Sequence, residues 1–153
     1  MTLRPDEVEL DFEIVKEPWN KYNLVDGSNL KMKYILKKVR RRIPEQGKPS
    51  YSVKSQNLIE AYNVPQNLRG PPAKVPLPPS ELKSAKKQEV GFTTLIEEWA
   101  EYLVEDGTRI RAKCSLIEVF RTEKTNPEGE PIYLANHSIT LNIKPSKSIM
   151  PLK

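Results

Sequence analysis

The chain has 153 residues, a net charge of +5, one cysteine and 14 prolines, so it has room for one ordinary domain or two small ones. No apolar run is long enough to span a membrane, and the first residues lack the basic and then apolar order of a secretory signal. A lone cysteine cannot form an internal disulfide, so we expect a cytoplasmic protein that has no membrane segment.

The first part of the chain, residues 1–64, predicts about four strands, roughly 8–16, 20–25, 29–41 and 50–61. Asp26-Gly27 lies between two apolar-patterned runs, which is a strong signal for a tight hairpin because glycine accepts a positive φ. In the strand that follows, every second residue from Leu30 to Leu36 is apolar. Val39 is also apolar, but it falls on the opposite face if this alternation continues. We therefore expect a β-bulge or a strand crossing after Leu36.

Residues 65–88 predict a stiff, extended linker, because prolines are dense between residues 65 and 79. The end of this linker, from Ser80 to Lys87, predicts a short helix with Ser80 as its N-cap.

The last part of the chain, residues 89–153, repeats the first at an offset of 80. Residues 10–42 align with residues 90–122 without a gap. The identical pairs are Phe12/Phe92, Glu17/Glu97, Trp19/Trp99, Tyr22/Tyr102, Asp26/Asp106, Gly27/Gly107, Lys33/Lys113, Leu36/Leu116, Val39/Val119 and Arg41/Arg121. The chain has only two tryptophans and both are matched, so we interpret the chain as an internal duplication.

The duplication decides an ambiguity in the second repeat. Residues 93–103 place apolar side chains at helical spacing, but the matching stretch contains Pro18, which would break a helix. Duplicated units should share a fold, so the extended interpretation holds for both. We expect an all-β fold in which two four-stranded units pack about a pseudo-twofold axis as a barrel or a sandwich.

The charge is concentrated in residues 31–42, where every charged side chain is basic. Such a block is often only a solvated surface, but it is also the pattern that seeks phosphate groups. The candidate nucleic-acid contacts are Lys31, Lys33, Lys37, Lys38, Arg40, Arg41 and Arg42, with Arg111, Lys113 and Arg121 in the second repeat. Acidic neighbours dilute the charge of the second set, so we expect the first repeat to bear the contact.

The repeated aromatic residues predict mainly core packing. Trp and Tyr lie three residues apart in each repeat, so on a regular strand they face opposite ways and one of them is exposed. We expect the exposed residues to be Tyr22 and Tyr102, where they could stack on bases.

Residues for catalysis or metal binding are sparse. Cys114 and His137 stand alone, and no glycine-rich phosphate loop is present, so we expect no metal, no cofactor and no enzyme activity. Asp26 and Asp106 are explained by their turns. For Glu17 and Glu97 three roles are open: meeting across the pseudo-axis, pairing with Lys33 and Lys113, or solvation.

The sequence therefore predicts a small, non-enzymatic binding protein whose partner is nucleic acid or a nucleoprotein. The alternative is a protein-interaction or assembly module, which uses the proline-rich linker or exposed strand edges to bind a protein partner or to form a homo-oligomer.

Overall fold

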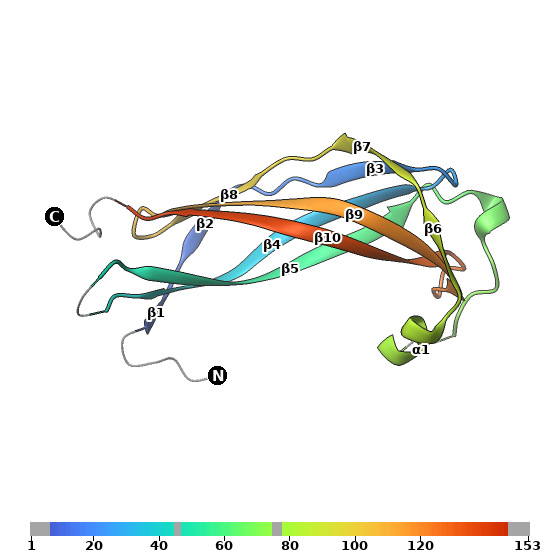
Figure 1. Cartoon of the computed structure of the whole chain (residues 1–153), viewed down its shortest axis with the longest axis horizontal. Coiled ribbons are helices and arrows are strands. Elements are labelled where there is room, and N and C mark those ends of the chain that lie inside the picture. The colour runs from blue at the N-terminus through green and yellow to red at the C-terminus, as the bar shows by residue number, and fades with distance from the viewer. Residues whose placement is uncertain (1–6, 45–46, 75–77, 147–153) are drawn as a thin grey trace.

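The computed structural model describes residues 7–44, 47–74 and 78–146, and within them it is an all-β protein. Figure 1 shows a long, narrow molecule in which most strands run along the long axis. The first half holds β1 (Glu7–Leu10), β2 (Phe12–Lys16), β3 (Asn20–Leu24), β4 (Asn29–Arg42) and β5 (Ser50–Tyr62). The second half holds β6 (Lys87–Val90), β7 (Phe92–Ile96), β8 (Ala100–Val104), β9 (Arg109–Thr125) and β10 (Pro131–Lys144).

The strands form two antiparallel sheets. In the first sheet the order is β5-β4-β3-β7, and β1 pairs with the far end of β4. In the second sheet the order is β10-β9-β8-β2, and β6 pairs with the far end of β9. Edge strands β5 and β10 lie side by side at the centre of Figure 1, where Asn57 hydrogen bonds to His137.

Each half of the chain gives one strand to the sheet of the other half. β2 pairs with β8, and β7 pairs with β3. The chain changes sheet at Asp11 and at Gly91, whose carbonyl oxygens accept hydrogen bonds of 2.9 Å from the backbone of Glu105 and Val25 respectively. The expected single strand over 8–16 was therefore wrong, because a break at Asp11 divides it into two strands that belong to different sheets.

The Asp-Gly hairpins are confirmed. Gly27 has a φ of +95° and Gly107 has a φ of +89°. Residues other than glycine rarely adopt such positive φ values, because their Cβ atom clashes with the backbone. The aspartate before each glycine accepts a hydrogen bond of 2.9 Å through Oδ1 from a backbone N–H two residues later, that of Ser28 or Thr108. The aspartate thus stabilises its own turn.

The change of register after Leu36 is a β-bulge. Leu36 pairs with Ser55, but the next pair is Lys38 with Lys54, so Lys37 is the extra residue. The second half of the chain has the same irregularity, with Ile117 left out of the pairing between β9 and β10. The bulge returns Val39 to the inner face, where it is fully buried.

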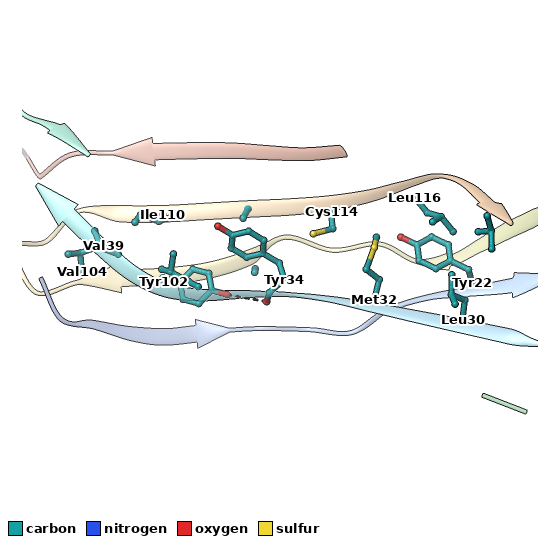
Figure 2. Packing of buried hydrophobic residues seen from close by; sticks show 14 of the residues in the cluster. Tyr22, Leu30, Met32, Tyr34, Val39, Tyr102, Val104, Ile110, Cys114 and Leu116 are labelled. Atoms are coloured by element: carbon teal, nitrogen blue, oxygen red, sulfur yellow. Dashed lines mark hydrogen bonds between the residues drawn. The ribbon is translucent and has the colours of Figure 1, made fainter. Parts of the chain in front are cut away.

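The core lies between the two sheets. Figure 2 shows Met32, Tyr34, Tyr102 and Cys114 filling the space between the strands that carry them. These side chains occupy alternate positions along β4, β8 and β9, so one face of each strand is apolar. The hydroxyl of Tyr102 donates a long hydrogen bond of 3.4 Å to the carbonyl oxygen of Tyr34.

The ambiguous stretch 93–103 is extended, as expected from its match to the stretch that contains Pro18. It consists of most of β7, a short connection and most of β8. Pro18 lies between β2 and β3, where no ladder hydrogen bond is required of it.

The linker carries a 3₁₀ turn over Gln66–Leu68 and helix α1 over Pro79–Ser84, so a short helix was expected correctly but its cap was not. Pro78 is the N-cap of α1, and Ser80 lies inside the helix. Residues 75–77 of the predicted linker lie outside the described residues. Among the described residues, no helix is long and apolar enough to cross a membrane.

Candidate nucleic-acid interface

The outer surface of the first sheet gathers lysines from three strands. The inward positions of β4 are apolar and buried, so the alternate positions face solvent. Lys21 on β3 lies opposite Lys31 on β4. We call this surface the basic face, and it comprises Lys21, Lys31, Lys33, Lys38, Arg40 and Lys54.

Acidic residues contact several cations of the basic face. Lys31 Nζ lies 3.9 Å from a carboxylate oxygen of Glu60, and Lys33 Nζ lies 3.7 Å from one of Glu17. Ion pairs at the surface contribute little to stability and are screened by salt. The side chain of Lys31 is 30% exposed, so its ion pair with Glu60 is in contact with solvent.

Trp19 lies within the basic face. The Nζ atoms of Lys31 and Lys33 are 4.6 Å and 5.4 Å from the centroid of its ring, and the Lys31 Nζ is 5.7 Å from that of Tyr62. Both rings are half-buried. The arrangement combines cations and an aromatic surface in one place, which is what binding of single-stranded nucleic acid requires.

The prediction that Tyr22 and Tyr102 are exposed was wrong. Their relative exposures are 0% and 1%, because both occupy the inward register of β3 and β8. Each hydroxyl donates a hydrogen bond to a glutamate of the other half of the chain: Tyr22 to Glu97 at 2.8 Å and Tyr102 to Glu17 at 2.7 Å. Burial, with a contribution from the glutamate, raises the pKa of both tyrosines. Neither tyrosine can stack on a base.

The roles of Glu17 and Glu97 follow from these contacts. Both accept a hydrogen bond from a buried tyrosine across the two halves, which was not among the three roles considered from the sequence. Glu17 also pairs with Lys33, as one of those roles proposed, and Glu97 accepts a hydrogen bond of 3.2 Å from Ser115.

Arg41 and Arg121 do not belong to the outer surface, so this part of the prediction was also wrong. The bulge reverses the register of β4 after Lys37, and Arg41 then follows Val39 on the inner face. Arg41 Nη1 lies 3.0 Å from Oδ2 of Asp106, and Arg121 Nη1 lies 3.0 Å from Oδ2 of Asp26. Both arginines are therefore structural.

A tyrosine completes each of these two clusters. Tyr133 donates a hydrogen bond of 2.7 Å to Asp26, and Tyr51 donates one of 2.9 Å to Asp106. Burial acts to raise the pKa of each aspartate, but the hydrogen bonds that it accepts outweigh burial and lower the pKa below its ordinary value. Burial also raises the pKa of Tyr133 to about 12. We call each aspartate, arginine and tyrosine set a lock, because it joins a turn of one half to strands of the other.

The remaining predicted cations of the first repeat are placed around the bulge. Lys37 is the exposed bulge residue, and Lys38 and Arg40 continue the basic face beyond it. Arg42 ends β4, where it pairs in register with Glu7 of β1. The structure thus brings together most of the predicted cluster but leaves Arg41 out of it.

The second half of the chain presents a more neutral outer surface. Arg111 lies 4.5 Å from the ring centroid of Trp99, and its Nε is 3.4 Å from a carboxylate oxygen of Glu101. Lys113 follows two positions later on the same strand face. Trp99 is the residue that aligns with Trp19 in the sequence, but one arginine contacts its ring, whereas two lysines contact the ring of Trp19.

Cys114 and His137, which stand alone in the sequence, both contact Asn57: the Cys114 thiol donates a hydrogen bond of 3.1 Å to Asn57 Oδ1, and the Asn57 amide hydrogen bonds to His137 Nε2. Burial raises the pKa of the Cys114 thiol to about 11, so the thiol is protonated at neutral pH. No cluster of potential metal ligands occurs in the described part of the chain.

The comparisons with known proteins found no counterpart. No protein-family model matches the chain, and no curated protein and no solved structure matches it.

Proposed function

We propose that the chain is a duplicated protein whose halves are related by a pseudo-twofold axis. β2 and β7 begin 80 residues apart, as do β3 and β8, and the exchange of strands is reciprocal. The two locks are also reciprocal, since each joins an aspartate of one half to an arginine of the other. Two copies of one ancestral unit would produce such matched contacts.

We further propose that this protein is a non-enzymatic, cytoplasmic binding protein and that the basic face contacts nucleic acid. The observation that carries the proposal is the position of the partly exposed Trp19 beside Lys31 and Lys33. Lysines contact phosphate oxygens and carry little sequence information, so binding would depend on salt and discriminate weakly between sequences. Stacking on Trp19 would favour single strands, whose bases are accessible.

The experiment compares matched pairs of substitutions in the two repeats. Lys31→Glu with Lys33→Glu should abolish binding of a labelled single-stranded oligonucleotide, measured by fluorescence anisotropy. Arg111→Glu with Lys113→Glu, at equivalent positions, should weaken it less. Arg41 and Arg121 are excluded from the set because their replacement would break the locks.

Salt dependence tests the same proposal without mutation. If about six phosphates are contacted, affinity should fall roughly a thousandfold between 50 and 200 mM salt. The fluorescence of Trp19 and Trp99 provides a second readout, since stacking on a base changes tryptophan emission. Absence of binding at low salt, or equal loss in the two double variants, would contradict the proposal.

Exposed strand edges favour assembly as a second candidate function. β2 ends the second sheet and β7 ends the first, and each carries exposed apolar side chains. They are Ile14, Val15, Leu95 and Ile96. An unpaired, apolar strand edge is suited to pairing with another chain. Sedimentation velocity of the wild-type protein and an Ile14→Lys variant would decide, since assembly through β2 predicts a loss of the larger species in the variant.

The proline-rich linker is a weaker candidate for partner binding, because part of it contacts the second repeat. The backbone N–H of Gly70 donates to the carbonyl of Gly129 at 2.9 Å, and that of Ala73 donates to Asn126 at 3.0 Å. Arg69 also pairs with Glu130 at 3.3 Å. A partner that bound this segment would have to displace these contacts.

A further inference from the structure

A hollow with a cavity volume of about 410 Å³ opens on β4 and β5 immediately after the bulge. It is lined by three cations, a serine and a valine: Lys38, Arg40, Lys54, Ser52 and Val53. The extra residue at Lys37 changes which side chains share a face, so the bulge creates this grouping.

The two lysines of the hollow lie directly opposite each other in the register of β4 and β5. Like charges at opposed positions of antiparallel strands destabilise the pair. Glu9 balances part of the charge: its carboxylate lies 3.8 Å from the Lys38 Nζ, and it is opposite Arg40 in the register of β1 and β4. Both members of the Lys38–Glu9 pair are about half exposed, so solvent screens the contact.

The second repeat has no such charge at the same place. Glu118 and Phe120 stand 80 residues after Lys38 and Arg40. Glu118 is opposite Asn136, which donates a hydrogen bond to it. The pair of opposed positions after the bulge is thus Glu118 and Asn136 in the second repeat, joined by a hydrogen bond, and Lys38 and Lys54 in the first. Pairing of the two strands therefore does not require lysines at these positions.

We propose that the hollow binds a phosphate group. Lys38, Lys54 and Arg40 supply positive charge and N–H donors, and the hydroxyl of Ser52 is a further donor. A bound phosphate would offset the repulsion between the two lysines. If the protein binds nucleic acid as proposed above, the phosphate belongs to the nucleic-acid backbone, and its binding positions that backbone on the basic face. The source of the phosphate therefore rests on the proposed function, whereas phosphate binding at the hollow does not.

Thermal unfolding in inorganic phosphate tests binding at the hollow. The melting temperature of the wild-type protein should rise by about 3–6 °C at a phosphate concentration ten times the dissociation constant, relative to chloride at equal ionic strength. The variant Lys38→Gln with Lys54→Asn should lose this rise. The control Arg109→Gln with Lys113→Asn makes the same change in charge on the other sheet and should keep it.

The two variants also separate binding from the general stabilisation that phosphate gives to folded proteins by exclusion from their surface. Without phosphate, the Lys38→Gln, Lys54→Asn variant should be at least as stable as the wild type, because a repulsion has been removed. If phosphate raises the melting temperature of the wild type and of this variant equally, the proposal is overturned. It is also overturned if chloride raises the melting temperature of the wild type as much as phosphate does.

Oligonucleotide binding by the same proteins distinguishes this proposal from the broader one. If both hold, the hollow variant should reduce the slope of log affinity against log salt by about two. A phosphate-dependent rise without oligonucleotide binding would support the hollow and reject nucleic acid as the source of the phosphate. Oligonucleotide binding with an unchanged slope and no phosphate-dependent rise would support binding through Lys31 and Lys33 and overturn the hollow.

Discussion

Arg41 donates a hydrogen bond of 3.0 Å to Asp106 across the two halves of the chain, at a site where the aspartate side chain is only 9% exposed. Removal of one partner leaves the other poorly solvated, so Asp106→Asn should reduce the free energy of unfolding by about 1–3 kcal/mol. Asp26→Asn, in the equivalent lock, should have a similar effect. Urea denaturation measures both; a loss below about 0.5 kcal/mol in either would show that the locks contribute little.

The locks also predict how stability depends on pH. The pKa values of Asp26 and Asp106 are lowered in the folded state, so their contribution is complete above the ordinary aspartate pKa of about 3.9. That contribution should be lost as the pH falls through the lowered folded-state values. Denaturation between pH 2 and 6 should therefore show a smaller decrease for the Asp26→Asn, Asp106→Asn double variant than for the wild type. If the free energy of unfolding depends on pH in the same way in the wild type and in the double variant, the pKa values of the two aspartates are not lowered by folding.

Substitution of the hairpin glycines tests the turn geometry. Gly27→Ala and Gly107→Ala should each cost about 1–2 kcal/mol, because both residues have a positive φ. The added Cβ of Gly27→Ala would also lie 3.0 Å from a Pro65 carbon. Gly91→Ala is the control, since Gly91 has no such φ and its Cβ would meet a Val25 methyl at 3.3 Å. If thermal melts show that Gly91→Ala lowers the melting temperature as much as the two hairpin variants do, positive φ is not the cause of their instability.

The exchange of β2 and β7 predicts that the halves remain associated after the linker is cut. A protease site introduced at residues 75–77 should give two fragments that elute together in gel filtration, because each contributes a strand to the other's sheet. In urea the fragments should separate and lose their β-sheet circular dichroism in one concentration-dependent transition. Separate elution of folded fragments in buffer would show that each half is independent.

Local patterns in the sequence predicted much of the secondary structure. Alternation along residues 29–36 indicated the buried face of β4, and the out-of-register Val39 indicated the bulge. The same parity places Arg41 inward, two residues after Val39, so its location was available from the sequence. Its positive charge favoured an outward, solvated position instead. The partner that neutralises this charge, Asp106, is distant in the sequence and could not be recognised from it.

The partners of the two halves could not be predicted from local patterns. Tyr22 and Trp19 are both aromatic, and only the register of β3 makes the tyrosine the buried member. The pairing of β2 with β8 depends on contacts between residues about 90 positions apart, which no periodicity within a strand specifies. The hollow escaped prediction for a related reason, because Lys38 and Lys54 meet only in the register of β4 and β5.

The exchanged strands also constrain how the protein is made. Residues 12–16 leave the ribosome long before β8, the strand with which they pair. Until then Ile14 has no sheet partner, and β3 lacks β7 on its outer side. The first sheet cannot be completed before β7 is synthesised, nor the second before β8 is, so the edge of β2 is exposed to neighbouring nascent chains throughout that interval.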